Sequence, residues 1–334
     1  MFLISQFMII SILAFLTAIP DVLHVFAAPT PMPAPAPPFE LLGGNDAPTT
    51  AVSITDLKSR FLRSAQFAAV AYCSSASVTS WQCGGPCQKV GQGVEVILAG
   101  GDDGAIPGFF VAHDPSDNSI VVAHQGLNPS DLLSILNVVE VALEDINSNR
   151  FTFAKDKGIQ VHDGFQQTFE RTADMILEAV KKGLADFNTN KVRVTGHSLG
   201  ATVATLDALM FKQELGDSID LKTTVFGMPR TGNQEFADFV DATLKDTFTR
   251  ISNQNDPVIR VPVPIPLVLE YQHASGEIYI KATTDGEATD VVACPGQENK
   301  NCGDDNNPLD SNGIQNHIGP YFDNISFGDS ACPL

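Results

Sequence analysis

A serine between two glycines is the residue of this chain best placed to act as a nucleophile. Ser198 lies in Gly196-His197-Ser198-Leu199-Gly200, after the β-branched run 192–195 and before a small, apolar stretch at helical spacing, residues 201–209. Strand, turn and helix in this order are typical of a nucleophile elbow, in which a strained turn exposes the serine hydroxyl near a helix N-terminus. The alternative is a glycine-rich turn that only joins a strand to a helix, so the pattern needs a base and an acid.

Two histidines could supply the base. Where such an elbow carries a catalytic triad, the chain order is serine, acid and histidine. That order leaves His273 and His317 among the seven histidines. His317 lies in a loop-like stretch near the C-terminus, whereas His273 comes just before an expected strand at residues 278–280. Because loops at strand ends carry catalytic residues more often, the residues alone favour His317, with His273 as the alternative.

The acid that orients the histidine is expected at Asp256. This residue stands in the polar turn 252–258, directly after an expected strand at residues 248–251. A carboxylate that leaves the sheet there could reach a histidine on a neighbouring loop. Taken by itself, Asp256 is interpreted equally well as an ordinary turn residue before a proline.

The elements that must position these residues alternate along the chain. The first expected helix is capped by Thr55. A single helix from Gly164 to Leu184 is expected before the elbow, and another from Gln234 to Leu244 after it. The expected strands are residues 94–98, 109–112, 120–123, 192–195, 223–226, 248–251 and 278–280. Alternation of this kind predicts an α/β fold with a mainly parallel central sheet covered by helices on both faces.

The N-terminal region predicts export. Residues 7–16 are apolar but too few to span a bilayer, and small residues follow near Ala27, so residues 1–27 are interpreted as a signal peptide. A membrane-anchored form is the alternative, because this segment has no Lys or Arg. Residues 28–50 are a proline-rich linker or propeptide, and residues 51–334 form one domain. Six cysteines favour disulfides over a zinc site in an oxidising compartment.

The charge balance limits the partners. With 20 basic and 39 acidic residues the net charge is −19, which argues against nucleic acid and against adsorption to anionic membranes. We expect a secreted, monomeric protein with no cofactor, no metal and no integral membrane segment after removal of the signal.

Six segments together resemble a known family. They are residues 161–165, 196–200, 227–233, 255–258, 273–277 and 316–321. In this order they are similar to the class 3 lipases of the filamentous-fungal type, and most similar to the secreted basidiomycete and yeast branch. The resemblance implies the α/β-hydrolase fold and a serine carboxylesterase. It also implies Ser198 as nucleophile, Asp256 as acid and His317 as base, and it gives His273 a structural position.

The resemblance further implies an oxyanion hole and a disulfide set. The backbone N–H groups of Leu127 and Leu199 would hold the developing negative charge. The implied disulfides are Cys73–Cys332, Cys83–Cys87 and Cys294–Cys302. Two positions depart from the family: Leu127 stands where many relatives have Ser or Thr, and Ala201 where a second glycine is usual.

A lid is expected after Leu127. Four apolar residues of this segment share one helical face: Leu132, Leu133, Leu136 and Val139. An ordinary core helix is the alternative, since periodicity alone does not separate the two. A leucine-rich lid predicts neutral acylglycerols at a lipid–water interface as substrates. A feruloyl-type esterase or phospholipase, and a catalytically silent binding protein on the same scaffold, are the other interpretations.

Overall fold

The computed structural model describes residues 45–101, 106–127, 142–265, 268–303, 313–328 and 332. The expected signal peptide and the four expected lid residues lie outside this part of the chain. All described residues belong to one compact unit, Leu41–Leu334. Within the described ranges, none of the helices combines the length and the apolar character that a membrane span requires.

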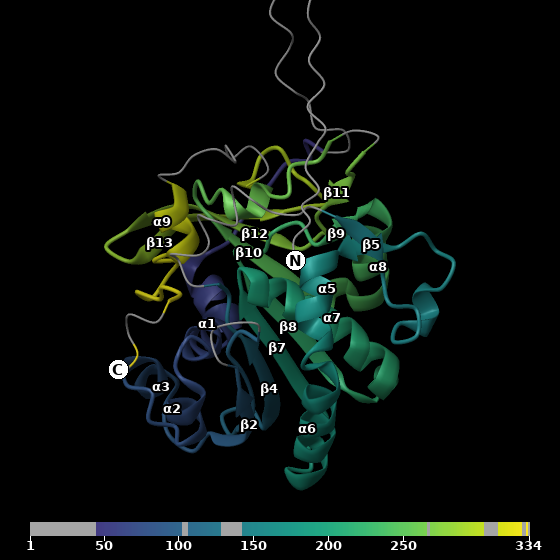
Figure 1. Cartoon of the computed structure of the whole chain (residues 1–334). Helices are drawn as coiled ribbons and strands as arrows, with labels where there is room; N and C mark the ends of the chain where they lie inside the picture. Colours follow the sequence, from purple (N-terminus) through teal and green to yellow (C-terminus); the bar gives the residue numbers. More distant parts are fainter. Residues whose placement is uncertain are drawn as a thin grey trace, which may run out of the picture. The chain divides into compact units, whose positions relative to one another are not determined.

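A nine-stranded sheet organises the chain, in the order β1-β13-β12-β10-β8-β7-β4-β3-β2 (Figure 1). Its strands are β1 (Thr50–Ala51), β2 (Glu95–Gly100), β3 (Phe109–Asp114), β4 (Ser119–His124), β7 (Lys191–His197), β8 (Asp220–Phe226), β10 (Phe248–Asn253), β12 (Glu277–Thr284) and β13 (Glu287–Cys294). The five strands from β4 to β12 are parallel, and antiparallel pairs close both edges. The expected α/β architecture with a mainly parallel sheet is confirmed. The sequence did not predict the antiparallel strand pairs at the two edges of this sheet.

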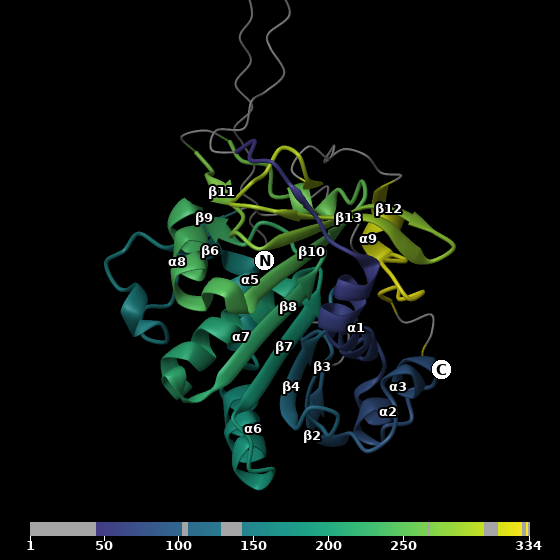
Figure 2. The same ribbon diagram turned by 180° about the vertical axis from the view of Figure 1, so that it is seen from behind.

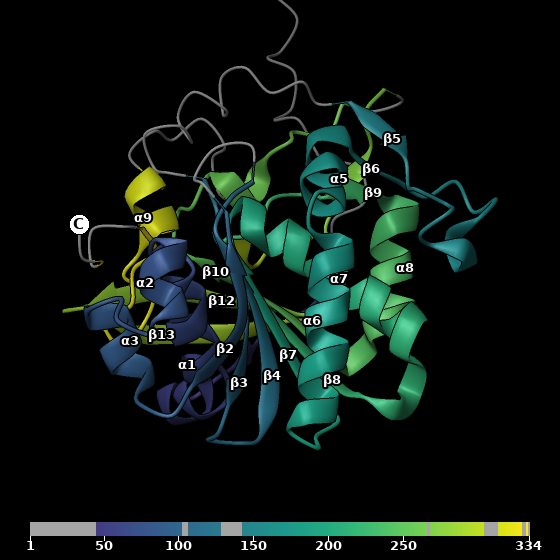
Figure 3. The same cartoon turned by 60° about the horizontal axis from the view of Figure 1, so that its bottom comes forward.

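Helices cover both faces of this sheet (Figures 2 and 3). Figure 3 shows α1 on one side of the strands and α6, α7 and α8 on the other. The longer helices are α1 (Ile54–Val70), α5 (Asp163–Glu170), α6 (Ala173–Asp186), α7 (Leu199–Leu215) and α8 (Gln234–Leu244). The shorter ones are α2 (Ser75–Thr79), α3 (Gly85–Val90), α9 (Ile314–Ile318) and the 3₁₀ turns η1 (Thr152–Ala154), η2 (Gly216–Ser218), η3 (Lys245–Thr247) and η4 (Val258–Arg260).

The alternation of side chains along β3 explains why both faces need a cover. Phe109 and Val111 pack into the core under α6, α7 and α8. Phe110 and Ala112 pack into a second core, with Phe67 of α1. All six residues of β3 are buried. A strand that is apolar on both sides is stable only between two layers of helices.

A second, smaller sheet has the order β11-β9-β6-β5. It consists of β5 (Leu143–Asp145), β6 (Gln160–His162), β9 (Gly232–Asn233) and β11 (Tyr271–Gln272). Its pairs are antiparallel and short, and they join segments that follow different strands of the large sheet.

Two sequence expectations on helix boundaries were wrong. The cap of α1 is Ser53, whose hydroxyl accepts the Asp56 N–H at 3.0 Å, and Thr55 lies inside the helix. The stretch expected to be one helix is two, α5 and α6. Thr172 interrupts it because its N–H bonds to the Phe169 carbonyl while its φ of −123° leaves the helical region.

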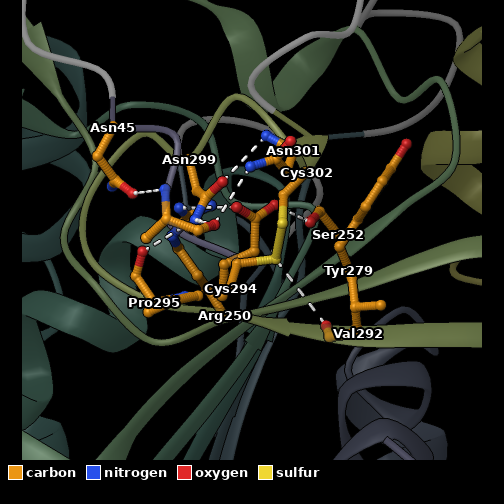
Figure 4. The surroundings of a disulfide bond; sticks show 12 residues. Asn45, Arg250, Ser252, Tyr279, Val292, Cys294, Pro295, Asn299, Asn301 and Cys302 are labelled. Carbon is orange, nitrogen blue, oxygen red and sulfur yellow. Dashed lines mark hydrogen bonds and ion pairs between the residues drawn. A yellow bond between two sulfur atoms is a disulfide. The ribbon is translucent and has the colours of Figure 1, made fainter. Parts of the chain in front are cut away.

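Three disulfides join the cysteines in the pairs that the family resemblance implies: Cys73–Cys332, Cys83–Cys87 and Cys294–Cys302. Figure 4 shows the last of these beside Arg250, Ser252 and Tyr279.

The Glu277 carboxylate lies close enough to Cys294 and Cys302 to suggest that the three residues could bind a metal ion. Both sulfur atoms are bonded to each other, however, so neither is a thiolate that could bind a metal.

Candidate active site

Ser198 forms the sharp turn between β7 and α7. Its φ of 59° and ψ of −129° are rare for any residue with a side chain, so the turn is strained. The Ser198 N–H donates to the Phe226 carbonyl of the neighbouring strand at 3.0 Å, which holds the turn in place. This is the geometry that the Gly-His-Ser-Leu-Gly pattern predicts.

The two flanking glycines are required by close backbone approach. A Cβ on Gly196 would lie 2.2 Å from the Gly200 carbonyl oxygen, so strand and helix could not meet with a larger residue there. A Cβ on Gly200 would lie 2.5 Å from the carbonyl oxygens of both His124 and Gln125. The first turn of α7 therefore rests directly on the backbone that leads from β4 to Leu127.

A buried carboxylate–imidazole pair lies near this turn. The Nδ1 atom of His317 is 2.8 Å from Oδ2 of Asp256, and both side chains are almost fully buried. The second oxygen of Asp256 accepts the Val258 N–H at 2.8 Å, which fixes the carboxylate. Since a carboxylate only accepts, Nδ1 of His317 carries the proton and Nε2 presents its lone pair.

The lone pair of His317 is available for a proton. Its Nε2 atom is buried and has no hydrogen-bond partner among the described residues. A Cβ on Gly227 would lie 2.9 Å from both Nδ1 and Cε1 of His317, so the imidazole stands directly over that glycine. Gly227 follows Phe226, to which the Ser198 turn is bonded. The structure thus places the Asp256–His317 pair beside Gly227, and the residue before that glycine is bonded to the Ser198 turn.

A buried hydrogen-bond chain ties this histidine to the loop before Leu127. The Nε2 atom of His197 is 2.9 Å from the His317 carbonyl oxygen, which can only accept. Its Nδ1 atom therefore accepts from the Tyr72 hydroxyl at 2.5 Å, and that hydroxyl accepts the Gly126 N–H at 3.1 Å. Burial, followed by the nearby His317, lowers the pKa of His197 well below its ordinary value, so the ring stays neutral.

A second buried pair anchors the end of β4 to the elbow helix. The Nε2 atom of His124 is 2.6 Å from Oδ2 of Asp207, and both side chains are buried. Burial raises the pKa of Asp207, and the hydrogen bond from His124 opposes that rise. His124 is the last residue of β4, and Asp207 lies in the middle of α7. The pair therefore fixes the strand end that leads into Leu127.

The two residues that the family resemblance implies as oxyanion donors, Leu127 and Leu199, lie on backbone segments close to Ser198. Leu199 is the first residue of α7, so its N–H has no partner within the helix. Leu127 lies one residue beyond Gly126, and a Cβ on Gly126 would lie 2.6 Å from the Cβ of Ser198. Both backbone segments thus run beside the serine.

His273 occupies a different environment. Its Nε2 atom is 2.7 Å from the Ile259 carbonyl oxygen, and its backbone N–H donates to the Glu298 carboxylate at 2.7 Å. Burial, helped by the guanidinium of Arg250, lowers the pKa of His273 to about 3. A histidine that is held neutral and bonded to a carbonyl oxygen suits a structural role.

Sequence reasoning missed Tyr72, His197, His124 and Asp207 as supports of the site. Tyr72 lies two residues beyond the end of α1, and Asp207 is a lone acid within the apolar helix α7. A polar group in such a helix indicates a buried partner but not its identity. His197 precedes the serine in the chain, so the order of serine, acid and histidine excludes it as the base and gives no indication of its contact with Tyr72.

The sequence of this chain is similar to those of known lipases. Residues 121–265 match the family described as "Lipase (class 3)"; this range includes Ser198 and Asp256 but not His317. A secreted mono- and diacylglycerol lipase LIP4 of Malassezia restricta is 33% identical over 294 residues, which are 87% of this chain and 91% of the relative. For LIP2 of the same species the identity is 34% over 203 residues, and the match spans 61% of each protein.

Solved structures show the same fold. The lipase of Rhizopus microsporus var. chinensis superimposes with a TM-score of 0.71 at 27% identity, covering 88% of this chain and 96% of that one. The Lip2 lipase of Yarrowia lipolytica gives a TM-score of 0.72 at 24% identity and covers 85% of this chain and 98% of its own.

Proposed function

This chain belongs to the class 3 lipase family, and we propose that it is a serine hydrolase that cleaves the carboxylic esters of acylglycerols. One observation carries the proposal: in the buried Asp256–His317 pair, Nε2 of the histidine has no hydrogen-bond partner among the described residues and lies near the strained turn of Ser198. A serine hydroxyl is a weak nucleophile at neutral pH, and such a base is what activates it.

The reaction begins with attack of the Ser198 Oγ on the ester carbonyl carbon. The hydroxyl proton passes to Nε2 of His317, while Asp256 holds the opposite proton on Nδ1 and stabilises the imidazolium. The C–O bond to the alcohol then breaks, and His317 returns the proton to the leaving oxygen. Water, deprotonated by His317 in turn, hydrolyses the acyl-serine and releases the fatty acid.

The tetrahedral intermediates carry a negative oxygen that needs donors. The backbone N–H groups of Leu127 and Leu199 serve this purpose, and each such donor contributes about 3 kcal/mol to transition-state stabilisation. Because position 127 is leucine, no side-chain hydroxyl adds a further hydrogen bond. The pairs Tyr72–His197 and His124–Asp207 hold the two backbone segments in register.

The proposed substrate class is based on the names of the relatives and on the net charge of this chain. The Malassezia relatives are named mono- and diacylglycerol lipases, and their names also describe them as secreted. They confirm the extracellular location that the sequence predicts. A net charge of −19 favours neutral glycerides over anionic lipids. The lid assignment of Leu132, Leu133, Leu136 and Val139 rests on sequence alone and is part of the proposal.

The decisive experiment compares the wild type with Ser198→Ala on a substrate panel. Monoolein, diolein, triolein, phosphatidylcholine and methyl ferulate would be assayed under one set of conditions. We expect the glycerides to be cleaved fastest and Ser198→Ala to lose activity by a factor on the order of 10⁶. The thermal unfolding midpoint serves as the control for folding.

Three outcomes would overturn the proposal. If a folded Ser198→Ala protein hydrolysed esters at the wild-type rate, the proposed serine mechanism would be wrong. Faster turnover of methyl ferulate than of any glyceride would replace the lipase with a cell-wall esterase. A protein inert to every ester and to a fluorophosphonate probe would instead be a binding protein on a hydrolase scaffold.

A further inference from the structure

One asparagine of the chain carries the sequence signature of a carbohydrate acceptor. Asn324-Ile325-Ser326 is the only place in the sequence where serine or threonine stands two positions after an asparagine without an intervening proline. Asn128-Pro129-Ser130 has the same spacing, but its proline excludes it. A triplet of this kind also arises by chance, so the surroundings of Asn324 must decide whether this residue can be modified.

Asn324 lies in a tight turn near the C-terminal end of the described chain. The Ile325 N–H donates to the Phe322 carbonyl at 3.0 Å, and the two residues between them, Asp323 and Asn324, have φ values of 53° and 52°. Two successive left-handed residues closed by such a hydrogen bond are typical of a type I′ turn, which favours Asp and Asn at these positions. The residue types therefore explain why the chain reverses here.

The side chains of the triplet lie on opposite sides of the surface. Ile325 is buried in the same core cluster as Phe322 and Phe327, whereas Asn324 and Ser326 are exposed. Burial of Ile325 holds the triplet against the body of the protein. The acceptor amide and the hydroxyl two positions later are consequently both accessible from solvent.

The amide nitrogen of Asn324 is not needed by the fold. Among the described residues, Asn324 makes hydrogen bonds only through its backbone: its N–H donates to the Gly286 carbonyl at 2.9 Å, and Lys89 Nζ donates to its carbonyl at 3.2 Å. A Cβ on Gly286 would lie closer to Oδ1 of Asn324 than to Nδ2, which would be 3.3 Å away. The oxygen of the amide thus faces the hairpin between β12 and β13, and the nitrogen is left for a covalent bond.

Contacts on both sides of the turn hold it in place without using the Asn324 side chain. The Tyr321 N–H donates to the Ile325 carbonyl at 2.9 Å, and the Phe327 N–H donates to the Ile318 carbonyl at 2.8 Å. The Tyr321 hydroxyl donates to the His317 carbonyl at 3.1 Å. A group attached to Nδ2 of Asn324 would leave all of these hydrogen bonds intact.

The route of the chain through the cell brings it to the sugar donor. The names of the relatives describe secreted proteins and confirm an extracellular location. All six cysteines form disulfides, as expected of a chain that folds in an oxidising compartment. In eukaryotes, N-linked oligosaccharides are attached to exported chains in such a compartment.

We propose that Asn324 is a modification site that carries an N-linked oligosaccharide. The donor is a lipid pyrophosphate-linked oligosaccharide whose first sugar is N-acetylglucosamine. Nδ2 of Asn324 bonds to C1 of that sugar, the C1–O bond to the pyrophosphate breaks, and the amide loses one proton, so nothing is oxidised or reduced. Ser326 supplies the hydroxyl that the transferring enzyme requires. The inference is independent of ester hydrolysis.

The test is the mass of protein secreted from a eukaryotic host, before and after digestion with a peptide N-glycosidase. We expect the wild type to lose one oligosaccharide and to show aspartate at position 324 after digestion. Asn324→Gln and Ser326→Ala should be secreted without the sugar, whereas Ser326→Thr should keep it because threonine also supplies the hydroxyl.

The matched control is Asn188→Gln. Asn188 is likewise exposed and left-handed, with φ of 48°, but Asn190 stands where an acceptor triplet needs a hydroxyl. This change should leave the loss of mass on digestion as in the wild type. Ser326→Ala keeps Asn324 and its turn, so it provides the comparison if Asn324→Gln is not secreted.

Two results would overturn the proposal. One is a secreted wild-type protein with the mass of the bare polypeptide, from a host that glycosylates a reporter protein in the same culture. The other is a sugar that persists in a secreted Asn324→Gln or Ser326→Ala protein, which would place it on another residue. Because the readout is mass, a failure of the proposed esterase activity would not affect this test.

Discussion

Two histidines after Asp256 satisfy the same chain order, yet their surroundings give them opposite properties. Nδ1 of His317 lies 2.8 Å from the Asp256 carboxylate, which orients the imidazole ring. His273 bonds to the Ile259 carbonyl, and burial is the largest cause of its low pKa, about 3. A residue that resists protonation this strongly is a poor general base at neutral pH.

His273 should therefore affect stability as a function of pH. Between the ordinary pKa of 6.5 and the folded-state value of about 3, the unfolded chain binds a proton that the folded chain does not. The free energy of unfolding then falls with decreasing pH, by up to about 1.4 kcal/mol per pH unit for this residue. We expect His273→Gln to flatten the slope between pH 6 and pH 5, measured by urea unfolding.

The control for that prediction is His317→Gln. It should lose hydrolysis almost completely, whereas His273→Gln should keep activity within a few-fold once folded. Equal pH slopes for the wild type and His273→Gln would contradict the low pKa of His273. An inactive His273→Gln protein beside an active His317→Gln protein would reverse the assignment of the base.

At the scale of helices and strands, the close contact between α7 and the end of β4 shapes the site. It needs Gly200, because the two carbonyl oxygens that a Cβ would meet at 2.5 Å belong to the backbone of His124 and Gln125 and do not move cheaply. Any separation of α7 from this strand end also separates the N–H of Leu199 from that of Leu127. Under the proposed mechanism, catalysis would therefore depend on how closely this helix and this strand end can pack.

Gly200→Ala tests that dependence. We expect kcat to fall by about 10²–10³, as when an oxyanion donor is lost. The control is Ala201→Gly at the next position, where the side chain is already accommodated. That change should leave kcat within a few-fold and lower the free energy of unfolding by about 1 kcal/mol, because glycine disfavours a helix interior. Steady-state kinetics with thermal unfolding would measure both, and a normal kcat in Gly200→Ala would contradict the account.

At the scale of the whole molecule, one disulfide joins the segment after α1 to the C-terminal region. Cys73 lies three residues beyond the end of α1, and its partner Cys332 is 259 residues away. The bridge Cys83–Cys87 spans only four positions. A longer closed loop removes more conformational freedom from the unfolded chain, so the two bridges should differ in their contribution to stability.

Replacing both cysteines of each bridge by alanine would measure that difference. We expect Cys73→Ala with Cys332→Ala to lower the free energy of unfolding by roughly 4–5 kcal/mol and Cys83→Ala with Cys87→Ala by roughly 2 kcal/mol. Urea unfolding of the oxidised proteins gives both values. A larger loss from the short bridge would mean that local packing around Cys83, and not loop closure, dominates.

The sequence by itself determined the parts of this protein that depend on local chemistry and chain order. The elbow was predictable because the turn at Ser198 requires glycines at fixed positions on either side. Asp256 became a candidate because it lies in the polar turn after a strand, and α8 was predictable from its apolar period between Gln234 and Leu244. The order of serine, acid and histidine then reduced seven histidines to two.

Only the tertiary structure decided which side chains support those residues. Tyr72 and His197 are 125 positions apart, and His124 and Asp207 are 83 apart, so no local pattern pairs them. Strand β13 and the short strands of the second sheet were likewise missed, since their partners are set by long-range hydrogen bonding. A residue's type can show that it needs a buried partner, but the partner is chosen by how distant segments pack together.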